Sequence, residues 1–329
     1  MKGKARLIRI KSDPADAELG RCVDGFGEYP SEDDQRARHS CEERGEQNGM
    51  KMSTSTMMKR EATDPTPKDA AIPDVQGRAD ARQIAINKVG VKEITYPITL
   101  RKPDGGAETT VASIDMYVSL PHNRKGTHMS RFLEILNENR EGIRPEKIIE
   151  ICHMMKERLD AKEAHMRLEF TYFIEKKAPV TGQPGLMNYG VTFECSSNCT
   201  DDFVMSVRVP ATSLCPCSKE ISAYGAHNQR CMLEAEVRFD GTLWIEEVVS
   251  MLEGAASAHL YSVLKRPDEK FVTELAYEQP KFVEDIVRDA AVALNGDERI
   301  KRYRVRSENF ESIHNHNAYA EIVSNYPTA

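Results

Sequence analysis

The sequence predicts an α+β protein in which one unit, made of a strand pair, a helix pair and a second strand pair, occurs twice. Two observations lead to this prediction. Apolar and polar residues alternate over most of the expected strands, which is typical of half-buried strands. Between the strand pairs of each half, the apolar residues instead recur at the spacing of amphipathic helices. Each unit is therefore expected to be an antiparallel sheet with a helix pair on one face.

Composition divides the chain into three regions. Residues 1–72 are rich in charged residues, Ser, Gly and Pro, and their few apolar residues show no helix or strand period. Such a segment cannot bury enough apolar surface to offset the entropy lost on ordering, so we expect a disordered tail. The periodic part begins at residue 73, and we place the first module at 73–199 and the second at 200–329.

The first module contains clear signals for turns and helix starts. Pro103, Asp104 and two glycines form a turn sequence between two apolar segments, and Pro145 suits the first position of a helix. We expect strands at 91–100, 112–120, 166–174 and 189–195, and helices near 129–140 and 145–160.

The second module repeats this order. A helix over 280–295 is expected to end at Gly296, and helical periodicity is also present near 244–264. One face of the sheet would have no helices, so oligomerisation is expected. The strands are predicted at 203–209, 233–239, 300–308 and 317–324.

The bulk properties exclude some classes of protein. A hydrophobic fraction of 40% and a charged fraction of 29% describe a globular chain, and a formal charge of −7 argues against general electrostatic binding of nucleic acid. No apolar run has the length of a membrane span, and the amino terminus lacks a signal-peptide pattern. We therefore expect a cytoplasmic protein whose eight cysteines are thiols or metal ligands.

The second half differs from the first by a long loop, residues 213–230. Cys215 and Cys217 flank Pro216 in this loop, and His227 follows twelve residues after Cys215. A thiolate and an imidazole on one loop can share a metal ion with a third ligand from elsewhere. The alternative reading is two small apolar thiols and a surface histidine, but the clustering favours a metal site.

A second metal hypothesis combines Cys195 and Cys199 with Cys215 and Cys217 in a structural zinc site of four cysteines. The spacing does not exclude it. Cys195, however, continues the alternating apolar face of its predicted strand, which fits a core position better.

Three further groups of residues have side chains suited to chemistry. His314 and His316 would point to the same side of a strand, where they could transfer protons or bind metal. An exposed polar bend is an equally good reading of this pair. Basic residues at 125–131 surround a predicted helix start and suit phosphate, although such residues are often merely solvated. Glu269 and Glu284 also have ordinary structural readings. Glu269 would be a surface acid, and Glu284 would be an acid in the first turn of a helix, where it interacts favourably with the helix dipole.

Three segments together resemble the GTP cyclohydrolase type IB family: KGTHMSRF (125–132), SLCPCSKEISAYGAHNQR (213–230) and ESIHNHNAYA (311–320). The resemblance extends over roughly residues 73–325. It implies the tunnelling fold, with two modules in tandem in each chain and chains assembled into an oligomeric barrel, a homotetramer. It also implies an enzyme that hydrolyses GTP at C8, releases formate and gives 7,8-dihydroneopterin triphosphate, the first step of tetrahydrofolate, pterin and queuosine biosynthesis.

The resemblance also implies roles for individual residues. One divalent metal, zinc, manganese or iron, would be bound by Cys215, His227 and Glu269, leaving an open position. Glu284 would bind the guanine and act in catalysis with Cys217, His314 and His316. The residues expected to hold the triphosphate are Lys125, His128, Arg131, Lys219 and Arg230.

Two alternatives remain open at this point. One is a tunnelling-fold nitrile reductase of the queuosine pathway, with Cys215 or Cys217 as a covalent nucleophile. The other is a non-catalytic scaffold stabilised by the four-cysteine zinc site. A cyclohydrolase would lose activity to chelators, whereas a reductase with a thiol nucleophile would keep it.

Overall fold

The computed structural model describes residues 74–324, so the predicted disordered tail at 1–72 lies outside the described residues. The first half has two strands, two helices and two strands. Its elements are β1 (Ile86–Arg101), β2 (Ala107–Leu120), α1 (Met129–Asn139), α2 (Pro145–Leu159), β3 (Ala164–Lys177) and β4 (Pro184–Ser197).

The second half begins and ends with strand pairs in the same way, and it contains more helices between them. Its elements are β5 (Asp201–Leu214), α3 (Pro216–Ile221), β6 (Asn228–Phe239), α4 (Ile245–Ala255), β7 (Ala258–His259), α5 (Arg266–Glu278), α6 (Val283–Asn295), β8 (Ile300–Asn309) and β9 (Ala318–Val323).

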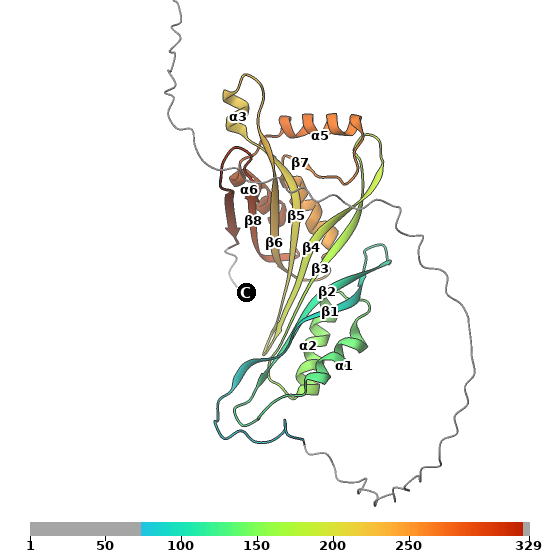
Figure 1. The fold of residues 1–329 in the computed structure, drawn as a ribbon, viewed down its shortest axis with the longest axis vertical. Helices are drawn as coiled ribbons and strands as arrows, with labels where there is room; N and C mark the ends of the chain where they lie inside the picture. The colour runs from blue at the N-terminus through green and yellow to red at the C-terminus, as the bar shows by residue number, and fades with distance from the viewer. Residues whose placement is uncertain (1–73, 325–329) are drawn as a thin grey trace, which may run out of the picture. The chain divides into compact units, whose positions relative to one another are not determined.

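All of these strands belong to one antiparallel sheet, which confirms the α+β class (Figure 1). The strand order is β1-β2-β3-β4-β5-β6-β8-β9, and the short β7 pairs with β5. At the centre, β4 pairs with β5 from Gly190 opposite Arg208 to Ser197 opposite Asp201. The two halves therefore share a continuous sheet, and their division at residue 199 stays an interpretation.

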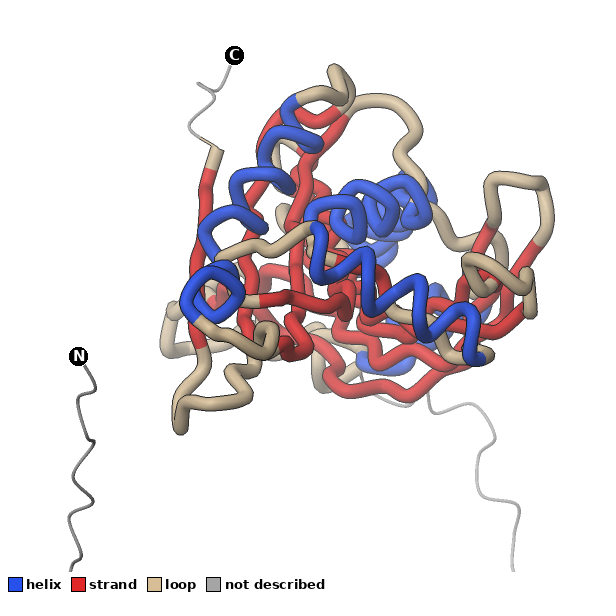
Figure 2. Tube along the Cα trace, turned by 90° about the horizontal axis from the view of Figure 1, so that it is seen from above, coloured by secondary structure: helices blue, strands red, loops and turns tan. Residues whose placement is uncertain are grey.

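The core lies between one face of the sheet and the helices α1, α2, α4 and α6 (Figure 2). Alternate residues of each central strand point into it; in β6, for example, Cys231, Leu233, Ala235 and Val237 are fully buried. This alternation arises because successive side chains of a strand point to opposite faces. None of the helices in residues 74–324 has the length and apolarity needed to cross a membrane.

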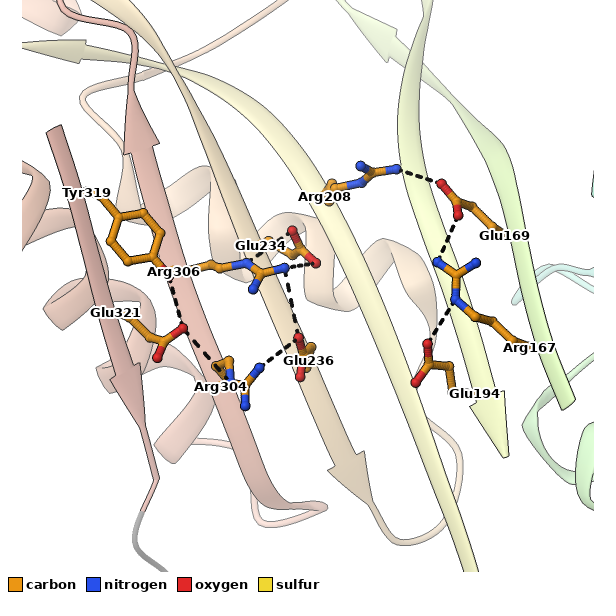
Figure 3. Close-up of polar contacts among 10 residues, drawn as sticks. All are labelled: Arg167, Glu169, Glu194, Arg208, Glu234, Glu236, Arg304, Arg306, Tyr319 and Glu321. Atoms are coloured by element: carbon orange, nitrogen blue, oxygen red, sulfur yellow. Dashed lines mark hydrogen bonds and ion pairs between the residues drawn. The ribbon is translucent and has the colours of Figure 1, made fainter. Parts of the chain in front are cut away.

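The other face of the sheet is charged (Figure 3). Arg167 of β3 contacts Glu169 at 2.8 Å and Glu194 of β4 at 3.0 Å, and Arg306 of β8 contacts Glu234 of β6 at 2.8 Å. Cross-strand pairs of opposite charge are compatible with water. The charged face therefore gives no reason of its own for oligomerisation. The outer edge of β9 does, because β9 pairs only with β8 within the described residues. The outer edge of β1 is partly occupied, since Leu100 forms a parallel bridge with Ile143.

The predicted helix over 244–264 is wrong beyond Ala255. After Ala255 the backbone is no longer helical. The backbone N–H of Ser257 instead donates to the carbonyl oxygen of Thr212 in β5, and β7 pairs with β5. Apolar residues such as Leu260 and Leu264 had continued the helical period without forming a helix. The sequence pattern does not predict α5, because only Ala276 and partly buried neighbours give this helix an apolar face. Gly296 does cap α6, but in a right-handed conformation with φ −73°.

Candidate active site

Nine of the twelve predicted site residues lie at one end of the sheet, which we call the α3 end. Here β5 ends at Leu214, β6 begins at Asn228 opposite it, and β8 ends at Asn309 opposite Cys231. The start of α6 is held at the same end, because the backbone N–H of Lys281 donates to the carbonyl oxygen of Leu214 at 3.0 Å. Figure 1 shows α3 and α5 close to this end of the sheet.

The chain brings Cys215 and His227 together by closing the loop between β5 and β6. The backbone N–H of Cys215 donates to the carbonyl oxygen of His227 at 3.1 Å. Ser218 lies between them, since its hydroxyl donates to the Cys215 carbonyl at 3.1 Å and accepts from the His227 backbone N–H at 3.2 Å. These bonds fix the backbones of two predicted metal ligands side by side.

Within this loop the two cysteines differ. Cys215 is the N-cap of α3, and its Sγ accepts the backbone N–H of Ser218 at 3.4 Å, which suits the thiolate form that binds metals. Cys217 lies inside α3 with an exposed side chain. The tertiary structure therefore gives the thiol of Cys215 a polar partner and leaves that of Cys217 exposed to solvent.

Glu269 is in the first turn of α5, on the same helix face as Val272 and Ala276. Those two residues pack in one small apolar cluster with Leu214 and Ala226, the immediate neighbours of Cys215 and His227. The helix that holds Glu269 is thus fixed against the loop that holds the other two predicted ligands.

The residues fit a divalent metal by donor type, because a thiolate, an imidazole and a carboxylate together suit zinc, manganese or iron. Cys215 and His227 also fit by their adjacent backbones. Across residues 74–324, however, no three Cys, His, Asp or Glu side chains lie close enough together to hold a metal ion. Coordination by this set therefore requires at least one of the three side chains to turn towards the others, and Glu269, which is exposed, is free to do so.

The predicted substrate and proton-transfer residues lie at the α3 end as well. Glu284 is exposed in the first turn of α6. His314 and His316 are exposed in the bend between β8 and β9, so they are not in a strand, yet their rings stack with centroids 5.2 Å apart. This bend is tied to the loop at 213–230, because Ser312 Oγ lies 3.2 Å from His227 Nδ1.

Two of the predicted triphosphate-binding residues, Lys219 and Arg230, lie at the α3 end and have different surroundings. Lys219 donates from Nζ to the carbonyl oxygen of Tyr277 at 2.5 Å and lies over the ring of the same residue, which connects α3 to α5. Arg230 is exposed on β6, on the sheet face that also contains Glu234.

Lys125, His128 and Arg131 lie at the opposite end of the same sheet. Arg131 donates from its guanidinium to the carbonyl oxygen of Arg158, near the end of α2, and β3 begins shortly afterwards. The starts of β3 and β5 are at one end of the sheet, because Ala164 and Asp201 both pair with Ser197. A single chain therefore does not bring these three residues to Cys215.

Comparison with known proteins identifies the family. The family model described as type I GTP cyclohydrolase FolE2 matches residues 72–320. The chain belongs to this family. It is 56% identical over 254 residues to a GTP cyclohydrolase FolE2 of Azoarcus sp. (strain BH72), covering 77% of this chain and 94% of the relative. It is also 56% identical over 251 residues to a GTP cyclohydrolase FolE2 of Geobacter sulfurreducens, covering 76% and 97%.

Solved structures give a weaker similarity. A uricase from Arthrobacter globiformis aligns with 74% of this chain and 95% of its own, at 9% sequence identity and a TM-score of 0.44. A similarity at this level does not extend to function.

The four-cysteine zinc hypothesis is incompatible with the fold of this FolE2-family chain. Cys199 precedes β5 and Cys215 follows it, and a strand of 14 residues places its ends about 45 Å apart. Cys195 is buried in the core against Cys152 of α2, as its strand position predicted. Their hydrogen bond, together with burial, raises the pKa of the Cys152 thiol above its ordinary value.

Four polar residues with structural roles near the α3 end are not singled out by the sequence pattern. Gln229 and Glu311 connect β6 to the bend after β8, Asp268 anchors the start of α5, and Glu253 is a buried acid of α4. Gln229 and Glu311 are within the segments that suggested the family, but an amide and an acid in loops give no distinctive signal. Asp268 gives no clear signal either, because Lys265 is not a usual capping residue and α5 has only a weak apolar face.

Proposed function

We propose that this chain is a metal-dependent GTP cyclohydrolase that opens the guanine ring of GTP at C8, releases formate and forms 7,8-dihydroneopterin triphosphate. The observation that supports the activity most directly is the family match over residues 72–320. Relatives called GTP cyclohydrolase FolE2 at 52–56% identity support it further. The reaction would start pterin synthesis in the cytoplasm, supplying tetrahydrofolate, queuosine or both.

We assign the metal ligands to Cys215, His227 and Glu269. The adjacent backbones of Cys215 and His227, and the packing of α5 against their neighbours, support this set. A divalent metal held there, zinc, manganese or iron, would supply Lewis-acid activation of water. Three mixed protein ligands leave an open position, as in catalytic and not structural metal sites.

Glu284 binds the guanine in this proposal. Its carboxylate can accept hydrogen bonds from the ring N–H and the exocyclic amine, and its exposure at the start of α6 leaves it free to do so. Cys217, His314 and His316 transfer or hold protons during ring opening. The stacked rings of the two histidines support a shared role, because a proton held by one is close to the other.

The triphosphate requires more than one copy of the chain. Lys219 and Arg230 are available at the α3 end, whereas Lys125, His128 and Arg131 lie roughly a strand length, about 45 Å, away in the same chain. A neighbouring copy would supply these three side chains. Within the described residues, the outer edge of β9 has no strand partner and suits such an assembly, and we propose the tunnelling fold with two modules per chain and a homotetrameric barrel.

The test is turnover of GTP by the purified full-length chain, with formate and the pterin product both measured. We expect both products, loss of both after chelation, and recovery when one divalent metal is restored. A chain that produced neither from GTP, but reduced a nitrile with NADPH after chelation, would be the reductase. Metal content measured on the same samples relates turnover to occupancy.

A further inference from the structure

The buried side chain of Gln229 links His227 to an acid in the bend between β8 and β9. Gln229 is 8% exposed and belongs to the core-facing side of β6. Its Oε1 lies 3.0 Å from Nδ1 of His227, and its Nε2 donates to Oε1 of Glu311 at 3.2 Å. Three hydrogen-bonded side chains therefore connect the loop at 213–230, through β6, to the bend that contains the two stacked histidines.

The chemistry of the three groups fixes the direction of these bonds. A carboxylate has only acceptors, so the amide nitrogen of Gln229 must face Glu311. The opposite amide orientation would place the carbonyl oxygen of Gln229 against Glu311, with two acceptors facing each other. The amide oxygen therefore faces His227, whose Nδ1 must have the proton and donate it.

A neutral imidazole with a proton on Nδ1 has its lone pair on Nε2. No residue within 74–324 forms a hydrogen bond to Nε2 of His227, so this nitrogen is available to a metal. Histidine ligands usually donate their other ring N–H to a carboxylate or carbonyl group, which fixes the ring orientation and makes the ligand more basic. Gln229 provides this carbonyl oxygen here, and Glu311 orients it.

We propose that Gln229 and Glu311 act as a positioning pair that holds His227 with Nδ1 protonated and Nε2 directed to a divalent metal. This inference rests on the proposed function, in which His227 is a metal ligand. Because Glu311 is in the segment that contains His314 and His316, the pair also fixes the start of that segment relative to the metal. The backbone N–H of Phe310, which donates to Arg230 at 2.9 Å, fixes it at a second point.

The test measures the affinity of the metal-stripped full-length chain for Co²⁺, by competition with a chelator and by the thiolate-to-cobalt absorption. Gln229→Met and Glu311→Met each remove the polar partner at similar volume, and we expect the dissociation constant to rise by about 10- to 100-fold. Glu311→Gln keeps an acceptor for the Gln229 amide, so we expect a change of less than about 3-fold.

A matched control is Ser307→Ala, which removes a buried hydrogen bond to Asn309 near the same end of β8 without contact to His227. Its Co²⁺ affinity should equal that of the unmodified chain. Thermal unfolding of each metal-free variant separates positioning from loss of fold. If Gln229→Met fails to fold, Glu311→Met, whose side chain is only partly buried, gives the answer.

His227→Ala distinguishes failure of the inference from failure of the proposed site. If His227→Ala loses Co²⁺ while Gln229→Met and Glu311→Met bind it as the unmodified chain does, the positioning pair is refuted and the metal site stands. If His227→Ala itself binds Co²⁺ with unchanged affinity and absorption, the metal assignment fails and the pair fails with it.

Discussion

At the scale of single residues, Cys215 and Cys217 are separated only by Pro216 but have different environments. Cys215 caps α3 beside the backbone of His227, whereas Cys217 is exposed within the helix. Cys195, the third cysteine of the rejected zinc hypothesis, is 2% exposed in the core. Replacing each of the three cysteines by alanine therefore tests a proposed metal ligand, a proposed proton-transfer group and a core residue.

We expect Cys215→Ala to lose the metal and the activity, because it removes one of three protein ligands. Cys217→Ala should retain the metal and slow turnover. Cys195→Ala should retain the metal and lower the free energy of unfolding by about 1 kcal/mol, as is usual for small changes in a core. Metal content, GTP turnover and thermal unfolding of the three proteins check this. Equal metal loss from Cys215→Ala and Cys217→Ala would contradict the assignment.

Glu284 offers a second test at this scale. Glu284→Gln keeps the volume of the side chain but replaces an acceptor-only group by one that also donates. One hydrogen bond from guanine is then lost, because an N–H of the glutamine faces an N–H of the base. We expect GTP turnover to fall by about 100-fold or more, with metal content unchanged. Asp285→Asn, one residue along the same helix, is a matched control. Normal turnover by Glu284→Gln would mean that another residue binds the base.

At the scale of elements, α5 depends on one buried carboxylate, that of Asp268. It caps the helix by accepting the backbone N–H of Lys265 at 2.9 Å. It also accepts the backbone N–H groups of Val180 and Thr181, both at 2.8 Å, and the Thr181 hydroxyl at 2.7 Å. Asp268 thus joins the turn between β3 and β4 to the helix that contains Glu269. These hydrogen bonds outweigh burial and hold the pKa of Asp268 below its ordinary value.

We expect Asp268→Asn to lower stability at neutral pH, because an amide is a weaker acceptor than a carboxylate. A lowered folded-state pKa means that the ionised carboxylate stabilises the fold above the ordinary value of 3.8, and that this contribution is lost as pH falls through the folded value. The difference between the two proteins should therefore shrink below about pH 4. Unfolding measured across pH checks this.

The control for this prediction is Asp285→Asn, which changes a capping residue of the same type in α6. Asp285 accepts the backbone N–H of Phe282 at 3.0 Å and forms an exposed ion pair with Arg288 at 3.6 Å, so it has no hydrogen bond or ion pair to another element among the described residues. Its replacement should cost about 1 kcal/mol or less, the usual effect of a helix cap. A larger effect at Asp285 than at Asp268 would show that the bonds to Val180 and Thr181 contribute nothing.

At the scale of the whole molecule, α4 of the second half is bonded to strands of the first. Glu253 of α4 is buried and accepts from Lys176 Nζ at 2.7 Å and from the Tyr189 hydroxyl at 2.9 Å. Tyr172 donates to Glu246 of the same helix at 2.5 Å. These contacts, with the pairing of β4 and β5, join the two halves into one cooperative unit.

We expect Lys176→Met to lower the free energy of unfolding by about 3 kcal/mol, because it leaves the carboxylate of Glu253 buried without its lysine, with only His259 at 3.3 Å as a basic neighbour among the described residues. Adding Glu253→Gln should restore much of the loss, since the neutral amide still accepts from Tyr189. The exposed pair Lys270 and Glu274 is the control, and Lys270→Met should change stability by less than about 0.5 kcal/mol. Chemical denaturation of these proteins measures all three values, and additive effects of the two core substitutions would argue against coupling.

The sequence by itself determined the class of fold and the family. Alternation in segments such as 203–209 fixes which side chains face the core, because a strand has a period of two. The segment at 213–230 predicted a metal-binding loop, because two cysteines and a histidine lie together in one short loop. Local patterns of this kind are complete within a few residues, so the sequence displays them directly.

Only the tertiary structure decided which of these residues meet. Pairing along the sheet places Lys125 at one end and Cys215 at the other, and it separates Cys199 from Cys215 by the length of β5. The roles of Asp268 and Gln229 likewise come from partners 88 and 82 residues away in the chain. Contacts at such separations depend on strand order and register, which the pattern of one segment does not contain.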